Sequence, residues 1–174
     1  MDISLTGDNF DEAFAAAMAE AESGKRTFIH PFNDPDTIIG QGTVAVEIME
    51  QIRDACSGID IIVVPVGGGG VVSGISIYVK EKSPHTQVIG VEPAEAAAMK
   101  ASLKHGAPVT LENISTFVDG AAVKRPGDLT FSIVQNNDVP IQTVPENRLC
   151  STLMDLHSLD GIVCEPAGAL SIDA

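Results

Sequence analysis

The chain has 174 residues and 44% of them are hydrophobic, which is enough to bury the core of one ordinary domain. It carries 24 Asp and Glu against 10 Lys and Arg, for a formal net charge of −14. Because this charge repels a nucleic-acid backbone and an anionic membrane surface, we expect neither as a partner.

Predicted strands and helices alternate along the chain. Short β-branched runs between turn residues predict strands, and apolar residues at every third or fourth position predict helices. The expected strands cover residues 3–5, 27–29, 59–66, 87–91 and 140–144. The expected helices cover residues 10–23, 37–56, 71–82, 96–104, 129–135 and 146–157, with an ordered loop over 106–128 and a strand-turn-helix unit over 161–174. This order predicts an α/β fold with a mostly parallel, twisted sheet and helices on both faces.

The most informative pattern is a run of four glycines between an apolar strand and a helix. These residues, here called the glycine loop, are Gly67, Gly68, Gly69 and Gly70, and the helix follows at Val71. Glycines allow a close backbone approach in which several N–H groups point at one anion, and the helix adds its positive end. A flexible linker is the alternative, but linkers are usually richer in polar residues and join separate domains. The pattern therefore predicts a phosphate-binding loop.

Two well-known nucleotide motifs fit this loop less well. A Walker loop ends in Gly-Lys-Ser/Thr, whereas Val71 and Val72 stand at that place. A dinucleotide fingerprint needs an acidic residue about twenty positions further on, and Glu92 has that spacing. Dinucleotide binding thus stays open on spacing alone.

An ordered series of motifs resembles the threonine dehydratase (threonine ammonia-lyase) family over essentially the whole chain. The motifs lie at residues 8–13, 30–32, 39–43, 64–70, 118–125 and 165–170. The stretch from Asp119 to Arg125 is more similar to the biosynthetic enzyme than to its close relative serine racemase. The resemblance implies a fold-type II pyridoxal-phosphate enzyme that converts L-threonine to 2-oxobutanoate and ammonia for isoleucine synthesis.

The resemblance also implies a cofactor site. In this family a lysine holds pyridoxal 5'-phosphate as a Schiff base and moves the α-proton of a small amino-acid substrate. By analogy Gly120 lies against the cofactor ring or its hydroxyl. The backbone residues that would hold the phosphate are Gly67, Gly68, Gly69, Gly70 and Val71. Independently of the resemblance, both ends interrupt a predicted sheet and leave apolar strand edges without partners, so we expect a homo-oligomer.

The family's catalytic lysine has no counterpart in this sequence. It lies upstream in a Ser-x-Lys-x-Arg-like stretch, and the serine that faces the pyridine nitrogen lies downstream in Ser-Gly-x-Asn. The six lysines are Lys25, Lys80, Lys82, Lys100, Lys104 and Lys124, of which only Lys124 lies in a family motif, without a catalytic role there. We therefore predict no catalytic residue here and no activity of the chain alone.

Both ends of the chain interrupt a predicted unit, so we interpret the chain as part of one catalytic domain. Residues 1–35 would belong to its smaller subdomain and crossover, and residues 36–174 to its larger subdomain. Two alternatives stay open. One is a serine racemase or a serine or diaminopropionate ammonia-lyase; the other is a non-catalytic module that binds a phosphorylated ligand.

The remaining polar candidates are weaker. Glu92 and the backbone of Ala96 match two positions of a cation site in related racemases, but the third falls on Ala98, which has no carboxylate. We therefore predict no metal site. His30 lies in a family motif, where it would line a cleft or serve as a packed or capping residue.

Cysteine usage indicates the compartment. Cys56, Cys150 and Cys164 are scattered without Cys-x-x-Cys spacing, which argues against a disulfide framework and a zinc cluster. The amino-terminal residues lack the pattern of a signal peptide. We expect a cytoplasmic protein.

Overall fold

The structure is a computed structural model that describes residues 3–8, 10–24, 26–53 and 58–174. The chain consists of two compact units, Met1–His30 and Pro31–Ala174. The predicted boundary near residue 35, between a smaller and a larger subdomain, stays a prediction.

The first unit contains helix α1 (Phe10–Glu22) and an aromatic cluster. The ring of Phe14 lies 5.4 Å from the Phe28 ring and 5.2 Å from the His30 ring, measured between centroids. The helix is followed by Gly24 with a φ of 74°, the left-handed conformation that commonly follows a helix end. The strands predicted at residues 3–5 and 27–29 are wrong, because both segments are irregular and no described segment of this unit pairs with them.

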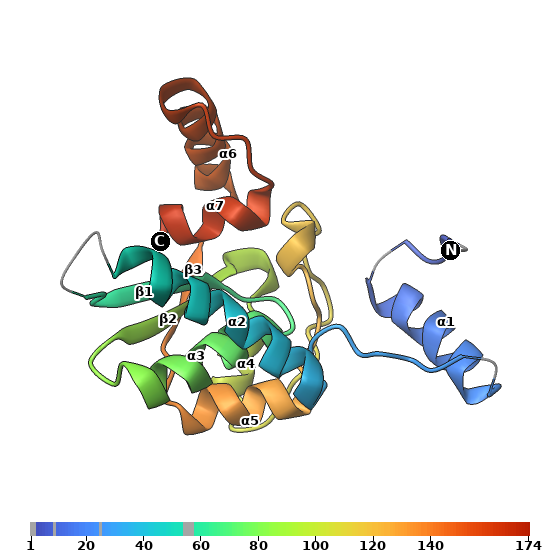
Figure 1. Ribbon diagram of the computed structural model, residues 1–174. Helices are drawn as coiled ribbons and strands as arrows, with labels where there is room; N and C mark the ends of the chain where they lie inside the picture. The colour runs from blue at the N-terminus through green and yellow to red at the C-terminus, as the bar shows by residue number, and fades with distance from the viewer. Residues whose placement is uncertain (1–2, 9, 25, 54–57) are drawn as a thin grey trace. The chain divides into compact units, whose positions relative to one another are not determined.

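The second unit is built on a three-stranded parallel sheet (Figure 1). Its strands are β1 (Ile61–Pro65), β2 (Gln87–Pro93) and β3 (Ile141–Val144), in that spatial order. Ile61 pairs with Gln87, and Gly90 pairs with Ile141. Since parallel neighbours need long crossovers, each pair is connected through helices.

The helices are close to those predicted. Before the sheet lies α2 (Pro35–Ile52), and α3 (Gly70–Lys82) connects β1 to β2. The β2 to β3 crossover contains a 3₁₀ turn (Ala94–Ala96), α4 (Ala98–His105), a loop with a second 3₁₀ turn (Asp119–Ala121) and α5 (Asp128–Asn136). After the sheet come α6 (Glu146–Asp155), a π-helical turn (Leu156–Asp160) and α7 (Pro166–Asp173).

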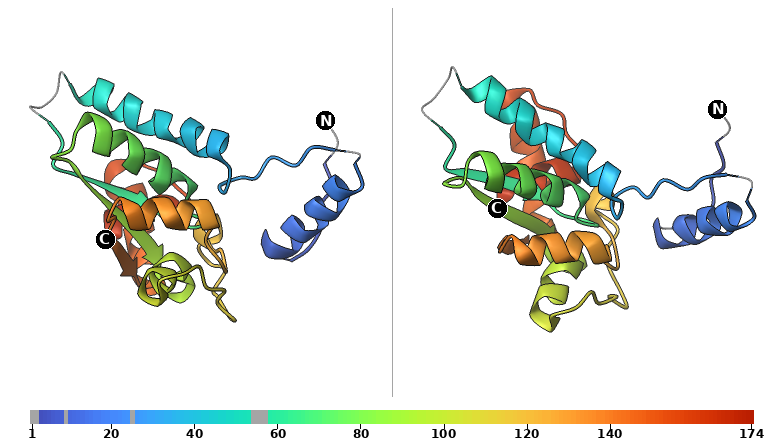
Figure 2. Two further views of the ribbon diagram at one scale, coloured as in Figure 1. Left: turned by 90° about the horizontal axis from the view of Figure 1, so that it is seen from below. Right: turned by 60° about the horizontal axis from the view of Figure 1, so that its bottom comes forward.

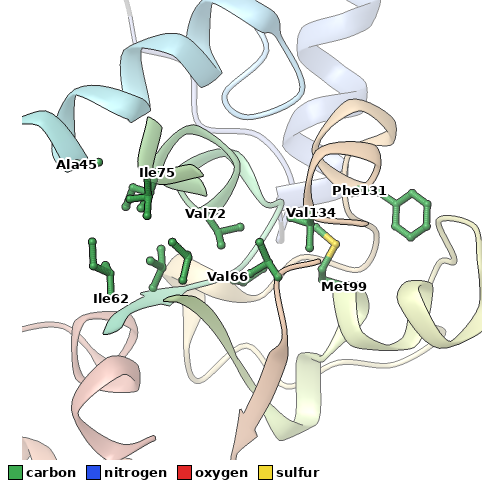
Figure 3. Close-up of a cluster of buried hydrophobic side chains, with 12 residues drawn as sticks. Ala45, Ile62, Val66, Val72, Ile75, Met99, Phe131 and Val134 are labelled. Carbon is green, nitrogen blue, oxygen red and sulfur yellow. The ribbon is translucent and has the colours of Figure 1, made fainter. Parts of the chain in front are cut away.

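One hydrophobic core lies between the sheet and helices α2, α3 and α5, which Figure 2 shows on the same side of the sheet. Ile62 and Val64, two residues apart on β1, enter this core because alternate strand side chains share a face. Further members shown in Figure 3 are Ala45, Val66, Val72, Ile75, Met99, Phe131 and Val134. This core fixes α3, whose first residue is the last glycine of the loop.

A second core covers the other face of the sheet. It joins Val91 and Val144 of the sheet to Leu149 of α6 and Leu170 of α7, and Val63 of β1 packs against it. Helices therefore cover both faces, which confirms the predicted fold class.

The strand expected at the start of the strand-turn-helix unit, after residue 160, is wrong. Residues 161–165 are irregular: Ile162 donates its N–H to the Leu156 carbonyl at 2.9 Å, which closes the preceding turn, and Val163 is 83% exposed. The helix predicted at the end of this unit is confirmed as α7, which begins at Pro166. The predicted end of the second helix, residues 54–56 with Cys56, falls outside the described residues. No helix of the described residues is long and apolar enough to cross a membrane.

Candidate functional site

The glycine loop lies at the carboxyl end of β1, where α3 begins. Gly69 is the residue before the helix, with a left-handed backbone at φ 94° and ψ 4°, and Gly70 is the first helical residue. A left-handed residue followed by a right-handed one turns three successive N–H groups, here those of Gly69, Gly70 and Val71, toward one point. Among the described residues, none accepts a hydrogen bond from these N–H groups. The backbone therefore forms a concave site for an anion.

Neighbouring residues leave no room for side chains on the loop. A Cβ on Gly69 would lie 2.7 Å from the Met99 Cε and 2.9 Å from the Thr130 Oγ1. A Cβ on Gly68 would meet the Phe32 ring. The side chains of Met99, Thr130 and Phe32 therefore pack directly against the loop. Position 69 requires glycine both for its left-handed conformation and because there is no space for a Cβ.

The first turn of α5 and the glycine before it also bind the loop through hydrogen bonds. The Gly68 carbonyl accepts hydrogen bonds from the Thr130 Oγ1 at 2.6 Å and from the Gly127 N–H at 3.2 Å. Leu129 donates its N–H to the Asn33 Oδ1 at 2.9 Å. Sequence reasoning did not identify these residues as part of the site, because Thr130 lies 62 positions from Gly68 and no local pattern marks such a contact.

Gly120 lies on a segment that contacts the glycine loop. A Cβ on Gly67 would lie 3.1 Å from the Cα of Ala121. A Cβ on Gly120 would lie 2.9 Å from the Ala167 Cβ and 3.1 Å from the Glu165 Oε1. The structure thus brings the loop and the Gly120 segment together, with the Glu165 carboxylate beside Gly120.

Glu92, at the carboxyl end of β2, is fully buried. Its Oε1 accepts a hydrogen bond from the Met99 N–H at 2.7 Å and its Oε2 accepts one from the Lys100 N–H at 2.9 Å. Burial raises the pKa of Glu92 to about 7, against the lowering effect of these hydrogen bonds and of the Lys100 charge. Both oxygens are engaged at the start of α4, so dinucleotide binding loses the acidic residue on which it depended.

The other polar candidates lie elsewhere. The His30 ring belongs to the aromatic cluster of the first unit, 5.8 Å from the Phe28 ring. Lys80 donates from its Nζ to the Asn136 carbonyl at 3.1 Å, near the end of α3 opposite the glycine loop. The Lys100 Nζ contacts the Thr143 Oγ1 at 3.4 Å. In the described part of the chain, no group of three or more His, Cys, Asp or Glu side chains could hold a metal ion.

This fold and loop define an α/β protein of the kind that binds ligands at the carboxyl ends of parallel strands. Comparison with protein families specifies the kind further. The chain belongs to the pyridoxal-phosphate dependent enzyme family, whose model matches residues 2–174.

Individual relatives agree with the family resemblance seen in the sequence. The chain is 49% identical over 170 residues to L-threonine dehydratase biosynthetic IlvA of Corynebacterium glutamicum, covering 97% of this chain and 39% of that protein. Threonine deaminase isoform 2 of Solanum lycopersicum, in its processed form, matches with a TM-score of 0.90 and 37% identity, over 99% of this chain and 49% of the other. A serine racemase of maize matches with a TM-score of 0.84 and 29% identity, over 97% of this chain and 50% of the other. The chain thus spans well under half of the curated dehydratase.

Proposed function

We propose that the glycine loop binds the phosphate of pyridoxal 5'-phosphate. The observation that carries this proposal is the convergence of the Gly69, Gly70 and Val71 N–H groups, which find no acceptor among the described residues. Gly67 and Gly68 let the loop backbone pack closely against its neighbours. A side chain on Gly67 would meet Ala121, and one on Gly68 would meet Phe32. These residues fit a phosphate, which is bound by backbone amides and a helix start despite the protein's negative charge.

Gly120 would lie against the cofactor ring or its hydroxyl. Its segment contacts the loop through Ala121, and its missing side chain lets its backbone lie close to Glu165 and Ala167. When bound, the cofactor takes up the electrons released as the substrate loses its α-proton. The residues of this chain bind the phosphate and orient the ring, while the lysine that moves the proton would lie outside this sequence.

At the level of the reaction, we propose that the chain is part of a threonine dehydratase, which converts L-threonine to 2-oxobutanoate and ammonia for isoleucine biosynthesis. Identity to the curated dehydratase is 49%, whereas identity to the maize serine racemase is 29%. That difference supports the dehydratase over the racemase. The protein would act in the cytoplasm as a homo-oligomer with a small amino-acid substrate.

The phosphate site is tested by titrating the 174-residue chain with pyridoxal 5'-phosphate and with pyridoxal, which lacks the phosphate. We expect amide NMR shifts at residues 67–71 with the phosphorylated compound only. Gly69→Ala should weaken binding by more than about tenfold, because it strains a left-handed residue and places a Cβ against Met99.

The matched control is Gly106→Ala. Gly106 also has a left-handed backbone, at φ 84°, but a Cβ there meets nothing within 4 Å. It should therefore lose stability without losing affinity. Shifts confined to residues outside the loop, or equal binding of pyridoxal, would contradict the proposed site.

A further inference from the structure

We propose that Thr130 is a positioning residue for the phosphate loop. Its hydroxyl would hold the peptide between Gly68 and Gly69 in the one orientation that turns the Gly69 N–H toward the anion. This inference rests on the proposed phosphate site and adds a residue that neither the sequence motifs nor the comparisons assign to it.

The argument begins with the geometry of a single peptide unit. In a trans peptide the carbonyl and the following N–H point in opposite directions. The Gly68 carbonyl is directed toward α5, where the Thr130 Oγ1 donates to it at 2.6 Å. The Gly69 N–H of the same peptide therefore points away from α5, toward the concave side of the loop.

The loop itself does not determine this orientation. Glycine residues on both sides of a peptide allow its plane to rotate, because no Cβ restricts φ and ψ. The Gly127 N–H also contacts the Gly68 carbonyl, but at the longer distance of 3.2 Å. The Thr130 hydroxyl thus makes the shorter of the two hydrogen bonds that fix this plane.

Thr130 is itself held rigidly. It has no exposed surface, and its backbone carbonyl accepts a hydrogen bond from the Ser73 Oγ of α3 at 3.4 Å. The next residue, Phe131, and Val134 both belong to the hydrophobic core on the α2, α3 and α5 side of the sheet. The loop orientation is therefore set by a helix that is anchored in the core.

The alternative is that Thr130 serves stability alone, through its packing and its contact with the Gly127 carbonyl of the preceding turn. Thr86 provides a matched comparison at the amino-terminal end of β2. Thr86 is also buried, with 6% of its surface exposed, and its Oγ1 donates to the Ile59 carbonyl at 2.6 Å. Loss of either hydroxyl removes a buried hydrogen bond, but only the loss at Thr130 disturbs the glycine loop.

The experiment titrates inorganic phosphate, and separately pyridoxal 5'-phosphate, into the 174-residue chain and its Thr130→Ala, Thr130→Ser and Thr86→Ala variants. The amide NMR shifts of the loop give the dissociation constants, and thermal melting gives the stability of each variant. We expect Thr130→Ala to weaken phosphate binding by about tenfold, and Thr130→Ser, which keeps the hydroxyl, to bind within about threefold of the unmodified chain. Thr86→Ala should melt at a lower temperature and bind phosphate normally.

The outcomes separate the two proposals. If the unmodified chain shows no phosphate-dependent shifts in the loop, the phosphate site is wrong and the role of Thr130 is wrong with it. If the unmodified chain binds but Thr130→Ala binds as well as Thr86→Ala, only the role of Thr130 is overturned. Should Thr130→Ala fail to fold, Thr130→Ser decides: normal affinity supports the hydroxyl, and affinity weakened by more than about tenfold shows that the methyl group matters instead.

Discussion

Glu92 places a carboxyl group where no water reaches it. Its position in β2 directs the side chain toward the first turn of α4, and its two oxygens accept the Met99 and Lys100 N–H groups. These N–H groups have no acceptor within their own helix, so the carboxyl group caps α4 from a neighbouring strand. Burial also removes the Glu92 carboxyl group from water, which makes its ionised form costly despite these hydrogen bonds.

The raised pKa of Glu92 predicts that stability falls as the pH rises. Because the folded-state pKa is about 7 and the ordinary value is 4.5, the stabilising contribution of the protonated form is complete below pH 4.5 and is lost as the pH rises through about 7. The loss amounts to about 3 kcal/mol at most. Urea unfolding at a series of pH values from about 5 to 8 should show it in the unmodified chain and not in Glu92→Gln.

Glu95→Gln is the control for this measurement, since Glu95 is an exposed glutamate three positions away. It should keep the pH dependence of the unmodified chain. An identical pH profile in Glu92→Gln would show that the Glu92 carboxyl group ionises at its ordinary pKa.

The sequence could predict the glycine loop at this scale but not the role of Glu92. Four glycines between an apolar strand and a helix predict an anion-binding loop without any knowledge of the rest of the fold. For Glu92 the sequence offers only its spacing from the glycine loop. Its hydrogen-bond partners are backbone N–H groups seven and eight positions away, and these face Glu92 only once α4 has formed. The same holds for Thr130, whose contact with the loop exists only after α5 packs on the core.

At the scale of elements, α5 ends in an unusual way. Asp138 has a left-handed backbone, with φ at 52°, and is the one non-glycine residue with positive φ among the described residues. The N–H of Val139 donates to the Val134 carbonyl at 3.1 Å, and the N–H of Asp138 donates to the Gln135 carbonyl at 3.1 Å. These two hydrogen bonds form a Schellman motif, in which the left-handed position is usually glycine.

Asp138→Gly should therefore stabilise the chain. Glycine removes the steric cost of the left-handed conformation, partly offset by its greater freedom in the unfolded state, for a net gain of about 0.5 kcal/mol. Thermal unfolding would show a higher midpoint. Asp138→Asn, which removes the charge and keeps the Cβ, should gain less; an equal gain would assign the effect to charge instead of backbone strain.

Helices were easier to predict than strands. The helix predicted at residues 71–82 is Gly70–Lys82 in the structure, because its start is marked by glycine and its last turn carries Lys80 and Lys82. A strand depends on a neighbour elsewhere in the chain. The apolar run at residues 27–29 has the composition of a strand, but no described segment of the first unit pairs with it. The local sequence pattern therefore cannot decide whether such a run forms a strand.

At the scale of the whole molecule, we propose that the candidate site binds the cofactor and does not supply the lysine that moves the proton. No hydrogen bond or ion pair links a lysine of the described residues to the glycine loop; Lys80 and Lys100 contact residues of other segments. Proton transfer from the α-carbon needs a base within hydrogen-bonding reach of that proton. The chain covers 39% of the curated dehydratase from Corynebacterium glutamicum, so the two can be compared directly by exchange of the matching segment.

We predict that the 174-residue chain alone forms no 2-oxobutanoate from L-threonine, and that it does so when it replaces the matching segment of the Corynebacterium glutamicum dehydratase. The chimera would join the phosphate loop of this chain to the remaining part of the relative, including the family's catalytic lysine. Its turnover should stay within about tenfold of the parent enzyme, because the exchanged segments are 49% identical over 170 residues.

The measurement follows 2-oxobutanoate from L-threonine and pyruvate from L-serine, with pyridoxal 5'-phosphate in excess. A chimera that carries Gly69→Ala is the control and should lose turnover together with cofactor binding, because its phosphate no longer meets three convergent N–H groups. If the chimera folds and binds the cofactor but acts only on L-serine, the proposed dehydratase function is wrong and a serine-specific function is favoured. Turnover by the chain alone would show that one of its own lysines reaches the cofactor, and the proposal that the proton-moving group lies outside this sequence would then be wrong.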